Sequence, residues 1–104
     1  MRVSRLRHRV ALLKPIRVPD EYGGARIDFE EVSIVWADFL RPNFGHQSIQ
    51  GDGDALVITQ GIRLRNTLVE RGWRVMQGEK IFDVLDVDKS VLGEVILTTQ
   101  EVER

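Results

Sequence analysis

Residues 29–40, with the sequence FEEVSIVWADFL, form the stretch that decides the fold class. β-Branched and aromatic residues crowd this stretch, which is typical of a β-strand. The side chains of a strand alternate between its two faces, and here both faces are apolar. One face carries Val32, Ile34, Trp36 and Leu40, and the other carries Val35, Ala37 and Phe39.

A strand with two apolar faces is unusual in a small antiparallel domain, where one face commonly meets water. Two interpretations follow: the strand bends around the corner of a barrel, or its second face meets another protein. We expect Trp36 to lie in the core. We assign Val35, Ala37 and Phe39 to contact with a neighbouring subunit.

Other segments also show the two-residue period of strands. In RLRHRVALLK (residues 5–14), Leu6, His8, Val10 and Leu12 share one face and arginines the other. ALVITQGIRLR (55–65) alternates as well, and its Gly61 suggests a bulge or a close approach of another chain segment. WRVMQGEKIFDVLDV (73–87) is typical of a hairpin, and GEVILTTQEV (93–102) of a last strand. The pattern predicts an all-β fold, a small antiparallel barrel of about six strands, with a sandwich as the alternative.

Two segments interrupt the strands. Residues 15–28 hold two prolines and a Gly-Gly pair, so we expect a long loop there. Residues 41–55 begin after a strand and are rich in glycine, so we expect a second long loop. At most one short helix is predicted, near residues 44–50, with Asn43 as its N-cap.

The composition suits a single soluble domain spanning residues 1–104, with 42% hydrophobic and 30% charged residues. The longest apolar run is shorter than the ~18 residues of a membrane span, and we expect neither an export signal nor a membrane partner. The chain has no cysteine, which excludes disulfides and cysteine metal sites and fits a reducing compartment.

Charge is unevenly distributed along the chain. Residues 1–19 carry arginines and a lysine but no acid, whereas acids outnumber bases in residues 20–54. Such asymmetry suits head-to-tail contact between copies, and a solvated surface with chance asymmetry is the alternative.

No residue pattern predicts catalysis. His8 and His46 are the only histidines, and His8 is interpreted as a hydrogen-bonded core or edge residue. GDGDA and DVLDVDK lack the ligand spacing of a calcium loop, and alternation places Asp83 and Asp86 on opposite faces. We therefore expect no catalytic residue, no metal and no cofactor.

An arginine-rich face is the strongest binding candidate. It is formed by Arg5, Arg7, Arg9, Arg63 and Arg65. Arginines at this density could bind phosphates, but few aromatic residues are left to stack on bases. A surface facing solvent or another subunit is favoured, and a monomeric barrel of the OB or SH3-like type that binds nucleic acid through these arginines stays open as the alternative.

The order of the motifs resembles the phage head–tail joining family, also called head–tail adaptor, stopper or head-completion proteins, which includes prophage and gene transfer agent versions. The matching pieces are Lys14-Pro15, DEYGG (20–24), VWA (35–37), a variable segment (41–55), IRLR (62–65) and GEKIFDV (78–84). They span about residues 5–102. The variable segment departs from the family pattern, which often has a glutamate-rich helix there.

The resemblance implies a non-enzymatic protein of the virion neck, assembled in the bacterial cytoplasm. It implies a sixfold or twelvefold ring of copies between a portal or adaptor protein and a tail terminator or other tail protein. Packaged double-stranded DNA passes through the channel of such a ring, which extends the channel and helps to retain the DNA.

The resemblance also suggests roles for surface residues. The arginines of the arginine-rich face join Val35, Ala37 and Phe39 in the subunit interface. The variable segment provides a channel or gating loop, with Phe44, His46, Gln47, Gln50, Asp52 and Asp54. The first loop faces the portal or the tail, with Asp20, Glu21, Tyr22 and Arg26.

Overall fold

The computed structural model describes residues 6–49 and 53–102, with the backbone alone described at 45–49 and 53–57. This part of the chain forms seven strands and no helix. The strands are β1 His8–Pro19, β2 Ala25–Phe39, β3 Asn43–Ile49, β4 Gly53–Arg65, β5 Arg74–Gln77, β6 Lys80–Asp88 and β7 Glu94–Glu101. The all-β prediction is confirmed.

The sheet closes on itself. Its strand order is β2-β1-β5-β6-β7-β4-β3, and β2 pairs a second time with β4. Ala37 lies at this closure, opposite His8 of β1 on one side and Leu64 of β4 on the other. Every pairing between neighbouring strands is antiparallel. The predicted antiparallel barrel is therefore confirmed, and closure pairs the strand edges within the barrel, whereas the arms keep free edges.

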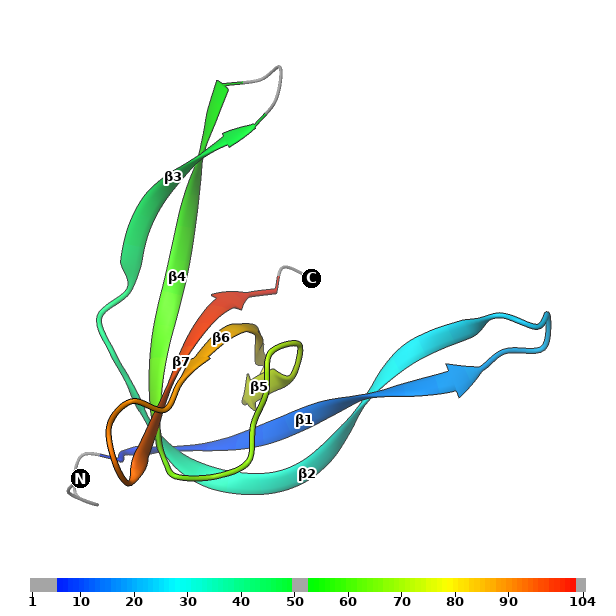
Figure 1. Cartoon of the computed structure of the whole chain (residues 1–104), viewed down its shortest axis with the longest axis horizontal. Helices are drawn as coiled ribbons and strands as arrows, with labels where there is room; N and C mark the ends of the chain where they lie inside the picture. The colour runs from blue at the N-terminus through cyan, green and yellow to red at the C-terminus, as the bar shows by residue number, and fades with distance from the viewer. Residues whose placement is uncertain (1–5, 50–52, 103–104) are drawn as a thin grey trace.

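Two hairpin arms project from the barrel (Figure 1). The β1–β2 arm continues the barrel strands outward, from the pair Lys14 and Glu30 to the pair Pro19 and Ala25. The β3–β4 arm is a second two-stranded ribbon, from Asn43 and Thr59 to Ile49 and Gly53. The radius of gyration is 15.5 Å, against about 13 Å for a compact chain of about 100 residues. The arms account for this extended shape.

Both predicted long loops are wrong in extent, because most of their residues belong to these arms. Only residues 20–24 of the first segment lie between strands. Pro15 and Pro19 fit because, in a two-stranded ribbon, each strand is an edge strand and can face its missing N–H outward. In the second segment a strand replaces the predicted helix, and Asn43 begins β3 instead of capping a helix. A helix this short has little stability of its own, whereas β4 pairs with every residue of β3.

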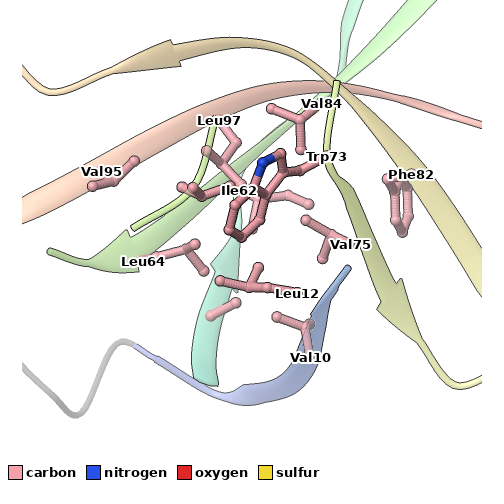
Figure 2. Close-up of a cluster of buried hydrophobic side chains, with 12 residues drawn as sticks. Val10, Leu12, Ile62, Leu64, Trp73, Val75, Phe82, Val84, Val95 and Leu97 are labelled. Atoms are coloured by element: carbon pink, nitrogen blue, oxygen red, sulfur yellow. The ribbon is translucent and has the colours of Figure 1, made fainter. Parts of the chain in front are cut away.

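The core fills the barrel and takes its side chains from most of the strands (Figure 2). Trp73 lies at its centre and is only 4% exposed. It precedes β5 and packs among residues of the other strands, including Leu12, Ile62 and Leu97. Phe82 is also buried.

The prediction that Trp36 belongs to the core is wrong, because its side chain is 50% exposed. The closure of the barrel decides this. Ala37 is fully buried between β1 and β4, and alternation then turns Trp36 outward. The odd-numbered neighbours Val35 and Phe39 pack against the core. Val35, Ala37 and Phe39, which were assigned to a subunit contact, therefore face the chain's own core, with Ala37 fully buried and the other two partly buried. The exposed face of β2 is that of Ile34 and Trp36.

Gly61 is a site of close approach, as its place in a strand suggested. A Cβ atom at this position would lie 3.2 Å from Leu40 Cδ1 and 3.3 Å from Leu40 Cβ. Glycine thus lets the segment that leaves β2 cross β4 at the base of the β3–β4 arm.

Candidate interaction surfaces

Among the side chains that the structure describes, those of residues 6–44 and 58–102, no group of three histidines, aspartates or glutamates is placed to hold a metal ion. His8 is exposed, its Nδ1 lies 3.1 Å from Gln77 Nε2, and its ring meets Phe39 edge-on at 5.3 Å. It is the hydrogen-bonded edge histidine that the sequence predicted. The same part of the chain contains no helix able to cross a membrane.

Cations and exposed apolar side chains meet on the outer side of β1, β2 and β4. We call this surface the basic face and define it by Arg7, Arg9, Ile34, Trp36 and Arg65. Arg9 lies opposite Trp36 across the strands, with its guanidinium carbon 5.6 Å from the ring centroid. All three arginines are exposed, and Ile34 is 53% exposed. An exposed tryptophan under an arginine suits contact with a partner that brings both apolar and acidic groups.

The predicted arginine set is only partly brought together. Arg63 is held within the chain, with its Nη1 3.6 Å from Asp38 Oδ2 and its Nε 3.2 Å from Glu94 Oε2. The Nε–H group makes no hydrogen bond, because it does not point well at the Glu94 carboxylate. These contacts join β2, β4 and β7, so Arg63 has a structural role. Arg5 lies outside the described residues.

A second charged surface lies on β6. We call it the acidic face and define it by Asp83, Leu85, Asp86 and Asp88. The register of β6 against β7 shifts at Leu85, which leaves Asp83 opposite Gln100 and Asp86 opposite Thr98. Gln100 and Thr98 share one face of β7, so the two aspartates also share one face. The expectation that they lie on opposite faces is wrong, because a β-bulge adds one residue between them.

The aspartates of the acidic face differ in their surroundings. Asp83 Oδ1 accepts a hydrogen bond of 2.7 Å from Arg74 Nε, and the Arg74 guanidinium also covers Phe29 at 4.2 Å. Asp86 is exposed. Hydrogen bonds from the side chain and then the backbone of Ser90 lower the pKa of Asp88, so this carboxylate is ionised at neutral pH.

The tip of the β1–β2 arm presents the residues predicted to face the portal or tail. Asp20 Oδ1 accepts hydrogen bonds from the backbone N–H groups of Tyr22 at 2.8 Å and Gly24 at 2.9 Å. Gly23 has a φ of +81°, which favours glycine. The turn holds Tyr22 outward, 93% exposed. Arg26 pairs with Asp28 at 3.2 Å and Glu21 is exposed, so all four predicted residues lie at this tip.

The β3–β4 arm presents an exposed apolar pair. Phe44 lies directly opposite Ile58, and the two side chains are 68% and 47% exposed. His46 and Gln47 are on β3 and Asp54 is on β4, with only their backbone described. Gln50 and Asp52 lie outside the described residues. The arm therefore carries the described part of the predicted channel loop on a regular ribbon.

The base of this arm is fixed by polar groups that the sequence did not single out. Gln60 Nε2 donates to the carbonyl oxygens of Leu40 and Gly61. Thr99 is fully buried, and its Oγ1 donates to the Gln60 carbonyl oxygen at 2.7 Å. Alternation alone gave no sign of these bonds, since they join β4 to β7 and to the segment after β2.

Comparison with solved structures agrees with the fold. A chain in the virion of a native gene transfer agent particle is similar over 94% of this chain and 96% of its own, at 23% identity and a TM-score of 0.69. A protein from Shigella flexneri 2a, solved in solution, is similar over 97% of this chain and 96% of its own, at 15% identity and a TM-score of 0.66. At these identities the likeness establishes the fold.

The family is established by sequence. No protein with a curated description matches the chain. The family model described as "Phage head completion protein" matches residues 1–103. That range includes all seven strands, both arms and both charged faces. The chain therefore belongs to the phage head completion protein family.

Proposed function

We propose that this protein is a structural component of the neck that joins head to tail in a phage or a phage-like particle. Membership of the head completion family over residues 1–103 carries the proposal. The similar chain in the virion of a gene transfer agent particle supports it, because a protein of the same fold is found there in an assembled particle. The cytoplasm of the host is where such a particle would be assembled.

The shape of the chain fits a part that touches several neighbours at once. A closed barrel gives a rigid body, and two arms reach away from it in different directions (Figure 1). The β1–β2 arm ends in the exposed Tyr22, and the β3–β4 arm exposes Phe44 and Ile58 near its base. In a sixfold or twelvefold ring, the barrels form the wall and the arms extend to the proteins above, below or inside it.

The β3–β4 arm is the candidate for lining or gating the channel. It carries the exposed pair Phe44 and Ile58, and its far end includes Asp54. Acidic groups do not hold DNA through counterion release as arginines do, so an acidic end lets DNA slide past. The β1–β2 arm, with Tyr22 at its tip, is then the candidate for contact with the portal or adaptor or with a tail protein.

Deletion of the gene from a host that produces the particles tests this role. We expect heads that fill with DNA but then lose it or lack tails, and an intact copy of the gene should restore tailed particles. If the deletion strain still releases full, tailed particles in normal number, the proposed role in the neck is wrong.

One observation favours the alternative function, nucleic-acid binding by a monomer. Trp36 is exposed beside Arg9, so the basic face combines a stacking surface with cations. A monomeric nucleic-acid-binding module should bind DNA with an affinity that falls steeply as salt rises. The neck function predicts weak binding of the free chain to DNA, and titration of labelled duplex and single-stranded DNA at two salt concentrations separates the two functions.

A further inference from the structure

The basic face and the acidic face lie on opposite sides of the barrel. Around the closed sheet, β6 is reached from β2 through β1 and β5, or equally through β4 and β7. β2 provides Ile34 and Trp36 of the basic face, and β6 provides the acidic face. One copy of the chain therefore carries two different charged sides that point away from each other.

The charges on these two sides are complementary. The basic face exposes Arg7, Arg9 and Arg65, while the neighbouring acids Asp38 and Glu94 are already engaged by Arg63. The sequence of β6, KIFDVLDVD, carries three aspartates and one lysine. Arg71 and Lys89 lie near Asp86 at one end of this side, together with Glu70. Asp83 is already engaged by Arg74, so Asp86 and Asp88 carry the negative charge that is left for a partner, with Arg71 and Lys89 at the margin.

Both sides also expose apolar side chains, which do not stabilise an isolated copy of the chain in water. Ile34 and Trp36 are half exposed in the basic face. On the other side, the β-bulge leaves Leu85 40% exposed beside Asp86. Each side therefore offers an apolar centre with charges around it, which is the usual anatomy of a protein interface.

We propose that the basic face of one copy packs against the acidic face of a second copy of this chain. In this contact Arg9 and Arg65 lie near Asp86 and Asp88 of the neighbour, and Trp36 lies near its Leu85. Two different surfaces meet, so the contact is heterologous and repeats from copy to copy, closing into a ring if the rotation allows it. The inference rests on the proposed function and names the surfaces that build the ring.

Cysteine cross-linking of the purified chain tests the contact directly, because the natural sequence has no cysteine. The variant with both Ile34→Cys and Leu85→Cys carries one thiol on each face. The two positions lie on opposite sides of one barrel, so a disulfide between them must join two copies. Under mild oxidation at high protein concentration we expect a ladder of linked dimers, trimers and larger species. Each single-cysteine variant serves as a control and can give at most a dimer.

Charge reversal adds a second readout in the same assay. Arg9→Glu or Asp86→Lys should each lower the yield of the ladder about two- to fivefold at low salt, the range expected for an exposed ion pair. The combination of both changes should restore it. Lys14→Glu, on the same strand as Arg9 but on its other face, is the matched control and should leave the yield unchanged.

The outcomes separate this proposal from the proposed function. Absence of a ladder, or a ladder that Arg9→Glu and Asp86→Lys leave unchanged, overturns the proposed contact. Loss of DNA binding in Arg9→Glu without any change in cross-linking also overturns the proposed contact, because the basic face then binds nucleic acid. If the deletion strain shows a role in the neck, that role stands after either of these results, and the ring must then be built from other surfaces.

Discussion

At the scale of single residues, the two tryptophans show how closure of the barrel sorts similar side chains. Trp36 stands in the most apolar strand of the sequence and is half exposed, whereas Trp73 stands beside arginines and is 4% exposed. Hydrophobic surroundings in sequence did not decide which one is buried. Burial is decided by Ala37, which is fully buried where β2 pairs with β1 and β4. Because side chains alternate along a strand, the inward direction of Ala37 turns Trp36 outward.

The two tryptophans should therefore respond very differently to truncation. Trp73→Ala should lower the free energy of unfolding by about 3–5 kcal/mol, because it opens a cavity in the core. Trp36→Ala should lower it by about 1 kcal/mol at most, since it loses only its contact with Arg9 and some half-exposed area. Urea denaturation of both variants measures the difference, and equal losses would contradict the burial described here.

Gly61 makes a second prediction at this scale. Gly61→Ala should lower the free energy of unfolding by about 1–3 kcal/mol, because the new Cβ crowds the Leu40 side chain. Leu40→Ala removes the nearer of the two contacting atoms, so the double variant should recover part of the loss in a double-mutant cycle. Simple additivity of the two changes would show that the crowding is not the cause.

At the scale of elements, the alternating segments were predictable and the arms were not. Strict alternation in residues 5–14 and 55–65 pointed to strands that are present in the structure. Pro15, Pro19 and the glycines of residues 41–55 suggested loops, but a two-stranded ribbon tolerates both residue types at its free edges. The bulge at Leu85 could not be predicted either, since nothing in DVLDVD marks the extra residue that turns Asp83 and Asp86 to one face.

The turn of the β1–β2 arm depends on one carboxylate. Asp20→Ala removes the acceptor for the N–H groups of Tyr22 and Gly24, so exchange of these amide hydrogens should quicken about fivefold, as for loss of about 1 kcal/mol. Asp20→Asn keeps an acceptor oxygen and serves as the control. The arm lies outside the core, so the urea midpoint should hardly move, and a large shift would show that the arm and barrel unfold as one unit.

The β3–β4 arm allows function to be separated from stability. The double change Phe44→Ser and Ile58→Thr replaces an exposed apolar pair, and it should alter the free energy of unfolding by less than about 0.5 kcal/mol. If the arm lines or gates the channel, particles carrying this variant should lose DNA or fail to release it. Normal DNA content and normal delivery, with a fully folded variant, would exclude the arm from that task.

At the scale of the whole molecule, a small barrel with two opposed charged faces and two projecting arms is suited to repeated contact. The sequence predicted the barrel, and its motif order pointed to the head-completion family that the match over residues 1–103 established. The subunit contact was assigned to the face of β2 that packs on the core, because alternation gives two faces but does not say which one is inside. We propose the face of Ile34 and Trp36 for that contact, together with the exposed arginines of the basic face.

The most direct test of the central claim is a cryo-electron microscopy map of the neck of intact particles. We predict a ring of these barrels at the junction of head and tail, with β2 of each copy against β6 of the next and the β3–β4 arms directed toward the DNA channel. A neck map in which density for this chain is absent, or in which it lies away from the head–tail junction, would contradict the account.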